Sequence, residues 1–256
     1  MDEIFWNRMN AETLRSRAAE DAIVILPLGS TEQHGPHLAT GVDDMMASEI
    51  ARRVALKLQN SGPVVVTPSL WCGLAEHHMD FGGTFTLRLS TYHALLRDLC
   101  DSIRRCGFRR IVIINGHGGN AQPLAALLTE LSIELDVSIA ITSYFVEGGA
   151  EIAQTLEDQV GYMHACEAET SLMMAVHPDL VFTDRLHEAC GPDLDVTGSF
   201  VPTLRTSRPF SALTSSGVAG TARRASAAKG EDLAEIGART IAAKLTSPGF
   251  WPDRGA

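Results

Sequence analysis

Short, continuous apolar runs alternate along this chain with longer segments in which apolar residues recur every three or four positions. The runs are rich in β-branched residues and read as strands that are buried on both faces. They lie at 22–28, 63–68, 109–116 and 137–145. The helical spacing predicts helices at 44–59, 91–107, 121–135, 165–177 and 229–245. Strands alternating with helices predict an α/β fold, a three-layer α/β/α sandwich with a mainly parallel central sheet.

One segment departs from this alternation. Residues 191–220 are rich in Gly, Pro, Ser and Thr, and we expect them to form a long loop or lid. The 256 residues are close to the upper limit for a single hydrophobic core. We therefore expect residues 1–256 to form a single domain.

Composition narrows the class of protein. The net charge of −10 makes the chain a poor binder of nucleic acid, which is held by clustered Lys and Arg. No apolar stretch approaches the length of a membrane span, and the charged N-terminus does not resemble a signal peptide. The five cysteines form no CxxC pair, which favours reduced thiols and a cytoplasmic location.

The stretch "GSTEQHGPHLATGVDD" (29–44) brings many polar side chains to the end of the first predicted strand. Glu32 and His34 are two positions apart, so in an extended segment they point to the same side and can reach one ion. Asp43 follows at the start of the next helix. The alternative for Asp43 or Asp44 is an N-cap.

A second polar cluster, "NGHGGN" (115–120), follows the third predicted strand. Ligand sites in parallel sheets lie just beyond the carboxyl ends of the strands, where both this His117 and the Glu32–His34 pair are expected. The stretch also fits a dinucleotide fingerprint, with Asp136 as the ribose acid. Asp136 precedes the fourth strand instead of ending a strand, however, so the nucleotide interpretation is the weaker one.

The third cluster is "HACEAETSLMMAVHPD" (164–179), where the helical spacing places two carboxylates on different faces of one helix. Glu169 lies on the apolar, inward stripe, whereas Glu167 shares a face with more polar residues. An ionised carboxylate is costly to bury unless it is paired or bound to a metal. The alternative is that Glu169 favours the dipole of the first helical turn. His164 is placed just before the helix and is expected to project into the same cavity.

Together the clusters offer carboxylates and imidazoles without cysteine, a donor set that suits Zn²⁺, Mn²⁺ or Fe²⁺. The candidate ligands are Glu32, His34, Asp43, His117 and Glu169. Five ligands exceed the need of one ion, whereas a bridging carboxylate lets two ions share them.

The motifs "LPLGSTEQHGPHL", "NGHGGN" and "HACEAETS" resemble those of the creatininase family of metal-dependent amidohydrolases. The resemblance runs from about residue 22 to 180. It implies an α/β/α fold, a homohexamer and two divalent metal ions per subunit, bound by the five ligands above. It also implies that Asp43 bridges the ions. Asp44 is then a neighbour or helix cap, and His37 lies behind the ligands or at the substrate rim.

The chain departs from the creatinine-opening members of that family. Those members carry an aromatic residue and a glutamate where this chain has Gly118 and Gly119. They also carry a Trp-Asp pair before the residue matching His164, and "FPGT" where this chain reads "FGGT". These differences argue against creatinine itself as the substrate and leave the metal chemistry unchanged.

The implied reaction is hydrolysis of a C–N amide bond in a small cyclic amide, lactam or formamide by a metal-bound hydroxide. His164 is the expected catalytic residue, shuttling a proton to the leaving nitrogen. Further substrate contacts are predicted at Glu76, His78, Gly118 and Gly119, with a plain polar loop as the alternative for the "EHH" segment. Within the family, a formamide deformylase or a peptidase acting on a cofactor precursor remains open. Outside it, the alternatives are an NAD(P)-binding oxidoreductase and a metal-stabilised scaffold without catalysis.

Overall fold

The computed structural model describes residues 2–194 and 206–252. At its centre, four parallel strands form a sheet in the order β2-β1-β3-β4. The strands are β1 (Ile23–Leu28), β2 (Val64–Val66), β3 (Arg110–Asn115) and β4 (Ser138–Ser143). Each falls within a predicted apolar run. The fourth ends sooner than predicted because Tyr144–Val146 turn into a 3-10 helix.

Helices connect and cover these strands. They are α1 (Ala11–Ala19), α2 (Val42–Leu58), α3 (Leu89–Arg105), α4 (Ala121–Leu135), α5 (Gly149–Thr155), α6 (Glu167–Val176) and α7 (Ala227–Leu245). The sequence pattern did not predict α1 or α5. In the first, no residue is fully buried and only Leu14 and Ala18 pack on the core, while the second is only seven residues long.

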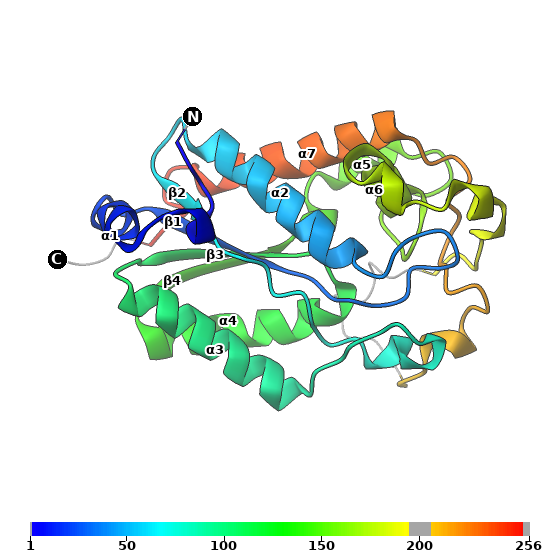
Figure 1. Ribbon diagram of the computed structural model, residues 1–256, viewed down its shortest axis with the longest axis horizontal. Helices are drawn as coiled ribbons and strands as arrows, with labels where there is room; N and C mark the ends of the chain where they lie inside the picture. The colour runs from blue at the N-terminus through cyan, green and yellow to red at the C-terminus, as the bar shows by residue number, and fades with distance from the viewer. Residues whose placement is uncertain (1, 195–205, 253–256) are drawn as a thin grey trace.

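The helices form two layers, one on each face of the sheet. Figure 1 shows α3 and α4 below the sheet and α2, α5, α6 and α7 above it. Alternate residues of β1 serve the two cores: Ile23 and Ile25 pack with α2, α6 and α7, whereas Val24 and Leu26 pack with α3 and α4. A strand that is apolar on both faces is therefore required, and the predicted three-layer α/β/α sandwich is confirmed.

The carboxyl ends of the central strands are in register. Asn115 at the end of β3 pairs with Leu28 of β1 on one side and Ser143 of β4 on the other. The Asn115 side chain donates to the Ser143 hydroxyl (2.9 Å) and to the backbone oxygen of His117 (2.7 Å). The segments that leave β1 and β3 therefore start side by side.

The N-terminus of α2 packs closely on these strand ends because two glycines lack side chains. A Cβ at Gly29 would lie 2.4 Å from Asp44 Cα, and one at Gly116 would lie 2.3 Å from the Asp43 carbonyl oxygen. This close approach brings the first turn of α2 to the carboxyl edge of the sheet.

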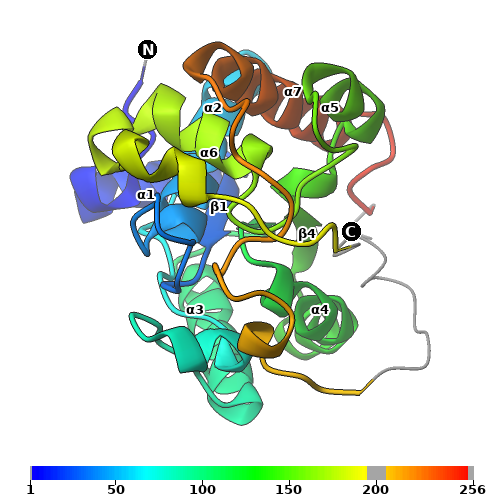
Figure 2. The ribbon, with the colours of Figure 1, turned by 90° about the vertical axis from the view of Figure 1, so that its right-hand side faces the viewer.

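The predicted long loop is described at residues 191–194 and 206–220, and its remainder at 195–205 lies outside the described residues. Its two ends meet, since the Gly191 N–H donates to the Gly220 carbonyl oxygen at 2.8 Å. Within it, the short 3-10 helix η8 (Phe210–Ala212) packs against η2 (Glu76–Phe81), where Phe210 lies 4.6 Å from the His78 ring. Figure 2 shows the second described part of this loop, which leads from η8 toward α7, crossing the end of the sheet where β1 and β4 are labelled.

Candidate metal centre

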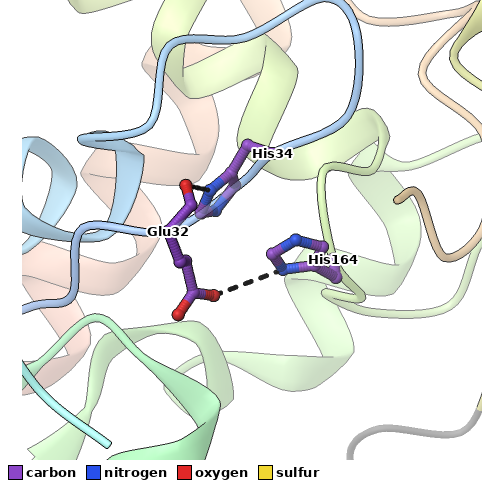
Figure 3. Close-up of side chains that lie close together, drawn as sticks. All are labelled: Glu32, His34 and His164. Atoms are coloured by element: carbon purple, nitrogen blue, oxygen red, sulfur yellow. Dashed lines mark hydrogen bonds and ion pairs between the residues drawn. The ribbon is translucent and has the colours of Figure 1, made fainter. Parts of the chain in front are cut away.

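Six of the predicted site residues converge at the carboxyl edge of the sheet. Glu32 and His34 follow β1, His117 follows β3, and Asp43 lies in the first turn of α2. Two more come from α6 and the residues before it, namely Glu169 and His164. All six are buried. Figure 3 shows the Glu32 carboxylate pointing toward His164, with the His34 ring beside them.

The candidate ligand atoms form three overlapping groups: one joins Glu32, His34 and His164, and the other two share Asp43. In the first of these two, His117 Nδ1 lies 3.1 Å from Glu32 Oε2 and 3.0 Å from Asp43 Oδ2. In the second, His34 Nε2 lies 3.1 Å from Asp43 Oδ1 and 4.0 Å from Glu169 Oε2. Asp43 thus gives one oxygen to each of these two groups, which is the arrangement of two neighbouring cation sites bridged by a carboxylate.

Backbone carbonyl groups orient three of the histidine rings. A carbonyl oxygen only accepts hydrogen bonds, so the ring nitrogen facing it must carry a hydrogen. The three pairs are His34 Nδ1 with Glu32 O (3.1 Å), His117 Nε2 with Leu74 O (3.1 Å) and His164 Nε2 with Gln33 O (2.8 Å). The opposite nitrogen of each ring faces the carboxylates and is free to bind a cation or a proton once the ring is neutral. Metal-ligating histidines are commonly anchored in this way.

Several carboxylate oxygens in the cluster face only histidine rings. Both Glu32 oxygens and Asp43 Oδ2 are buried and, among the described residues, accept no hydrogen bond of good geometry, although ring nitrogens of His78 and His117 lie 3.0–3.2 Å away. An ionised carboxylate is costly to bury without compensation. Cations would supply that compensation, and the oxygen and imidazole donors match the preferences of Zn²⁺, Mn²⁺ and Fe²⁺. The residues present therefore fit a pair of divalent cations.

The pKa shifts of the clustered side chains are also consistent with a cation site. Burial raises the pKa of Glu32, and it raises the pKa of Glu169 to about 7. Burial alone would lower the pKa of His34 and His117. The surrounding carboxylates outweigh it, raising the pKa of His34 to about 9 and that of His117 well above its ordinary value. These raised pKa values mean that the groups bind protons more readily when no cation is present, and bound cations would displace such protons.

The residues predicted to contact substrate occupy different environments. His78 is buried within the cluster, with Nε2 3.2 Å from Glu32 Oε1. Gly118 is exposed, and a Cβ there would meet no atom within 4 Å. A Cβ at Gly119 would lie 2.4 Å from the Leu74 carbonyl oxygen. Glu76 is exposed at the start of η2 and is not among the groups that gather at the centre.

For Asp44 and His37 the structure excludes one of the two expected roles and is consistent with the other, a place beside or behind the ligands. Asp44 does not cap α2, because the helix begins at Val42 with Gly41 as its N-cap. The helix starts two residues before the apolar spacing indicates. His37 does not lie at a rim: it is fully buried, with Nε2 2.8 Å from the Thr170 hydroxyl oxygen.

Glu167 shares its face of α6 with more polar residues, as expected, yet its side chain is fully buried. Lys229 of α7 pairs with its carboxylate, which also accepts from the backbone N–H of Asp158 at 3.0 Å. That face is buried because α7 packs directly on it: a Cβ at Gly230 would lie 1.9 Å from the Ser171 carbonyl oxygen. Glu167 therefore joins α6 to α7 and is not part of the metal-ligand groups.

The sequence pattern missed Gln33. Alternation along an extended segment would turn it away from Glu32 and His34. In the folded chain its amide instead contacts the rings of His78 and His164. The contacts depend on η2 and on the segment before α6, both far away in sequence.

The dinucleotide interpretation is not supported by the fold. Asp136 is the C-cap residue of α4 and precedes β4. It therefore lies at the amino edge of the parallel sheet, opposite to the edge that carries His117.

The family model for creatininase, described as creatinine amidohydrolase, matches residues 7–245. The chain belongs to the creatininase family. Among its family relatives, the creatinine amidohydrolase of Pseudomonas putida is 31% identical over 94% of this chain and 93% of that protein. A mycofactocin precursor peptide peptidase of Mycolicibacterium smegmatis is 30% identical over 90% and 86%.

Solved creatininase structures share the fold. The structure named "Creatininase Mn" has a TM-score of 0.82 and 28% identity, over 96% of this chain and 100% of that one. A mutant creatininase named as a Zn-Zn type has a TM-score of 0.78 and 28% identity, over 97% and 100%. The family and its hydrolase class, with amidohydrolase and peptidase relatives that cleave C–N bonds, confirm the predicted hydrolase.

Proposed function

We propose that this creatininase-family chain hydrolyses a C–N amide bond in a small cyclic amide, lactam or formamide, with two divalent cations. The observation that carries the proposal is the sharing of Asp43 between two ligand groups. Glu32 and His117 complete the first group, and His34 and Glu169 complete the second. Zn²⁺ and Mn²⁺ are the preferred ions, because the donors suit them and the solved relatives are named for them, with Fe²⁺ as a further candidate.

When bound, such cations polarise a carbonyl group and lower the pKa of water. The chain itself supplies the proton transfer. His164 Nε2 is held by the Gln33 carbonyl oxygen, so Nδ1 is the atom that can take a proton from the attacking water. Nδ1 lies 3.7 Å from Glu32 Oε1, at the edge of the ligand cluster. From there it can return the proton to the leaving nitrogen.

Gly118 favours a second candidate within the same chemistry, a peptidase acting on a peptide precursor. A Cβ at Gly118 would meet no atom within 4 Å, and this open space leaves room for a substrate to extend beyond a small ring. The similarity to a mycofactocin precursor peptide peptidase supports this candidate as much as similarity to creatinine amidohydrolase supports the first. Gly118→Tyr should separate the two, because it narrows this space and would impair peptide cleavage more than small-ring hydrolysis.

The test combines metal analysis with a hydrolysis screen of lactams, cyclic ureas, formamides and short peptides. His117→Ala should lose bound metal and activity together. His164→Ala should keep its metal and lose about 10²- to 10⁴-fold in kcat, the usual contribution of a general acid–base group. Full activity in metal-free protein, or in His164→Ala, would disprove the proposal.

We further propose that the enzyme is a cytoplasmic homohexamer. Trp71 and Phe85 pack edge to face at 5.3 Å while about half exposed, which supports a subunit contact. The five cysteines are free, which supports a reducing compartment. Among the described residues no helix has the length and apolar character to cross a membrane. Light scattering on the purified protein would measure the subunit number directly.

A further inference from the structure

The Gln33 side chain lies between two histidine rings that face the metal centre. Its Nε2 is 2.9 Å from His164 Nε2 and 3.0 Å from His78 Nδ1, and the two rings stack with centroids 4.4 Å apart. Backbone groups fix the amide: the Gly35 N–H donates to Oε1 at 2.9 Å, and Nε2 donates to the Gly217 carbonyl oxygen at 3.1 Å. Because one backbone group only donates and the other only accepts, the amide has a single orientation.

The hydrogen-bond partners then determine where the ring hydrogens lie. His164 Nε2 is 2.8 Å from the Gln33 carbonyl oxygen, so it must carry a hydrogen. In a neutral imidazole, the nitrogen that carries the hydrogen has its electron pair in the aromatic system, so it cannot also accept from the Gln33 amide. The amide has one hydrogen left after Gly217, and the acceptor within reach is His78 Nδ1. That nitrogen must therefore lack a hydrogen.

The two rings consequently present opposite groups to the same carboxylate oxygen. With Nδ1 of His78 unprotonated, its hydrogen lies on Nε2, 3.2 Å from Glu32 Oε1. The neutral form of His164, with its hydrogen held on Nε2 by the Gln33 carbonyl oxygen, is the form that can accept at its other nitrogen. Its Nδ1 then carries a lone pair, 3.7 Å from the same oxygen. His78 offers a donor to the centre, and His164 offers an acceptor.

We propose that Gln33 is a positioning residue that assigns the ring hydrogens of His78 and His164. Its side-chain amide fixes His78 and its backbone carbonyl fixes His164, so the centre is faced by one donor and one acceptor. Gly217 is part of this arrangement, because its φ is +73° and a Cβ there would lie 2.1 Å from Gln33 Oε1. Residues 206–217 thereby reach the metal centre through the Gln33 amide. The proposal concerns ring hydrogens and holds whether or not the chain catalyses the proposed hydrolysis.

Nitrogen NMR of the zinc-loaded protein, with ¹⁵N in the histidine rings, tests the proposal directly. In the wild-type protein both His78 and His164 should carry hydrogen on Nε2. In Gln33→Glu, whose carboxylate accepts but does not donate, His78 should move its hydrogen to Nδ1. His164 should not change, because its partner is a backbone oxygen, and it serves as the internal control.

Gln33→Met is a second variant of similar length that neither donates nor accepts strongly at this position. It should give a mixture of His78 forms at unchanged zinc content. The proposal is overturned if wild-type His78 carries hydrogen on Nδ1, a result that needs no variant to fold. It is also overturned if His78 keeps its hydrogen on Nε2 in Gln33→Glu.

Discussion

Replacing Gly116 with alanine should displace a metal ligand without changing any candidate ligand. The new Cβ would lie 2.3 Å from the Asp43 carbonyl oxygen, and atoms at such contacts are not found closer than 3.0 Å. The first turn of α2 must therefore move away from β3 by at least 0.7 Å. Metal ligands must hold their distances to within about 0.2 Å. A shift of this size should weaken metal binding by about tenfold or more.

The same substitution should destabilise the fold. Adding a methyl group to a closely packed position costs about 1–3 kcal/mol. For a chain of this length, about 2 kcal/mol corresponds to a fall of roughly 4–8 °C in Tm. Thermal unfolding of the metal-free protein measures the packing cost, and a calorimetric metal titration measures the affinity.

Gly118→Ala is the matched control, since it makes the same chemical change two residues further along. No atom lies within 4 Å of the new Cβ, and the φ of Gly118 is not in the left-handed region. Both Tm and metal affinity should stay at the wild-type value in this control. If Gly116→Ala binds metal and unfolds as Gly118→Ala does, the close packing of α2 does not position Asp43.

Three further predictions concern binding and stability. Adding Mn²⁺ or Zn²⁺ to metal-free protein should raise Tm with concentration, by an amount equivalent to about 2.7 kcal/mol at 100 times Kd; a calorimetric scan without a shift would contradict the metal centre. Lys229→Met leaves the buried Glu167 carboxylate without its cation and should lower the free energy of unfolding by about 3 kcal/mol, measured with urea. Arg239→Met, which breaks a half-exposed ion pair, is the control and should leave the urea midpoint unchanged. Burial would raise the pKa of Glu49, but hydrogen bonds from two neighbouring arginines outweigh it and lower that pKa below its ordinary value of 4.5. The stabilisation from this carboxylate is therefore present above pH 4.5 and is lost as the pH falls through the lowered pKa. Glu49→Gln should be about 1 kcal/mol less stable than the wild type at pH 7, and this difference in stability should shrink in acid.

The order of the strands and of the longer covering helices could be predicted because those elements carry their own period, whereas α1 and α5 were not predicted. The runs around Ile25 and Ile113 are apolar throughout, since both faces of the sheet are covered. Ligand residues could also be expected at the ends of these runs, because parallel strands finish at a common edge. The helical facing of Glu169 indicated an inward carboxylate by the same local logic. How those residues bind metal remains a prediction that the proposed variants test.

Contacts between distant segments decided the rest. Glu167 is buried because α7 covers a face of α6 that looks more polar in sequence, and Lys229 supplies the charge that permits it. Gln33 reaches the centre because η2 and the segment before α6 bring His78 and His164 to it.

The sequence by itself therefore determined the strands, the longer helices and which polar residues follow them, because periodicity and chain order are local properties. Only the tertiary structure decided which of those residues meet. The pairing of Glu32 with His117 and the sharing of Asp43 depend on strand register and on the contact of α2 with Gly29 and Gly116. Such contacts join residues far apart in the chain, and no local pattern records their distances.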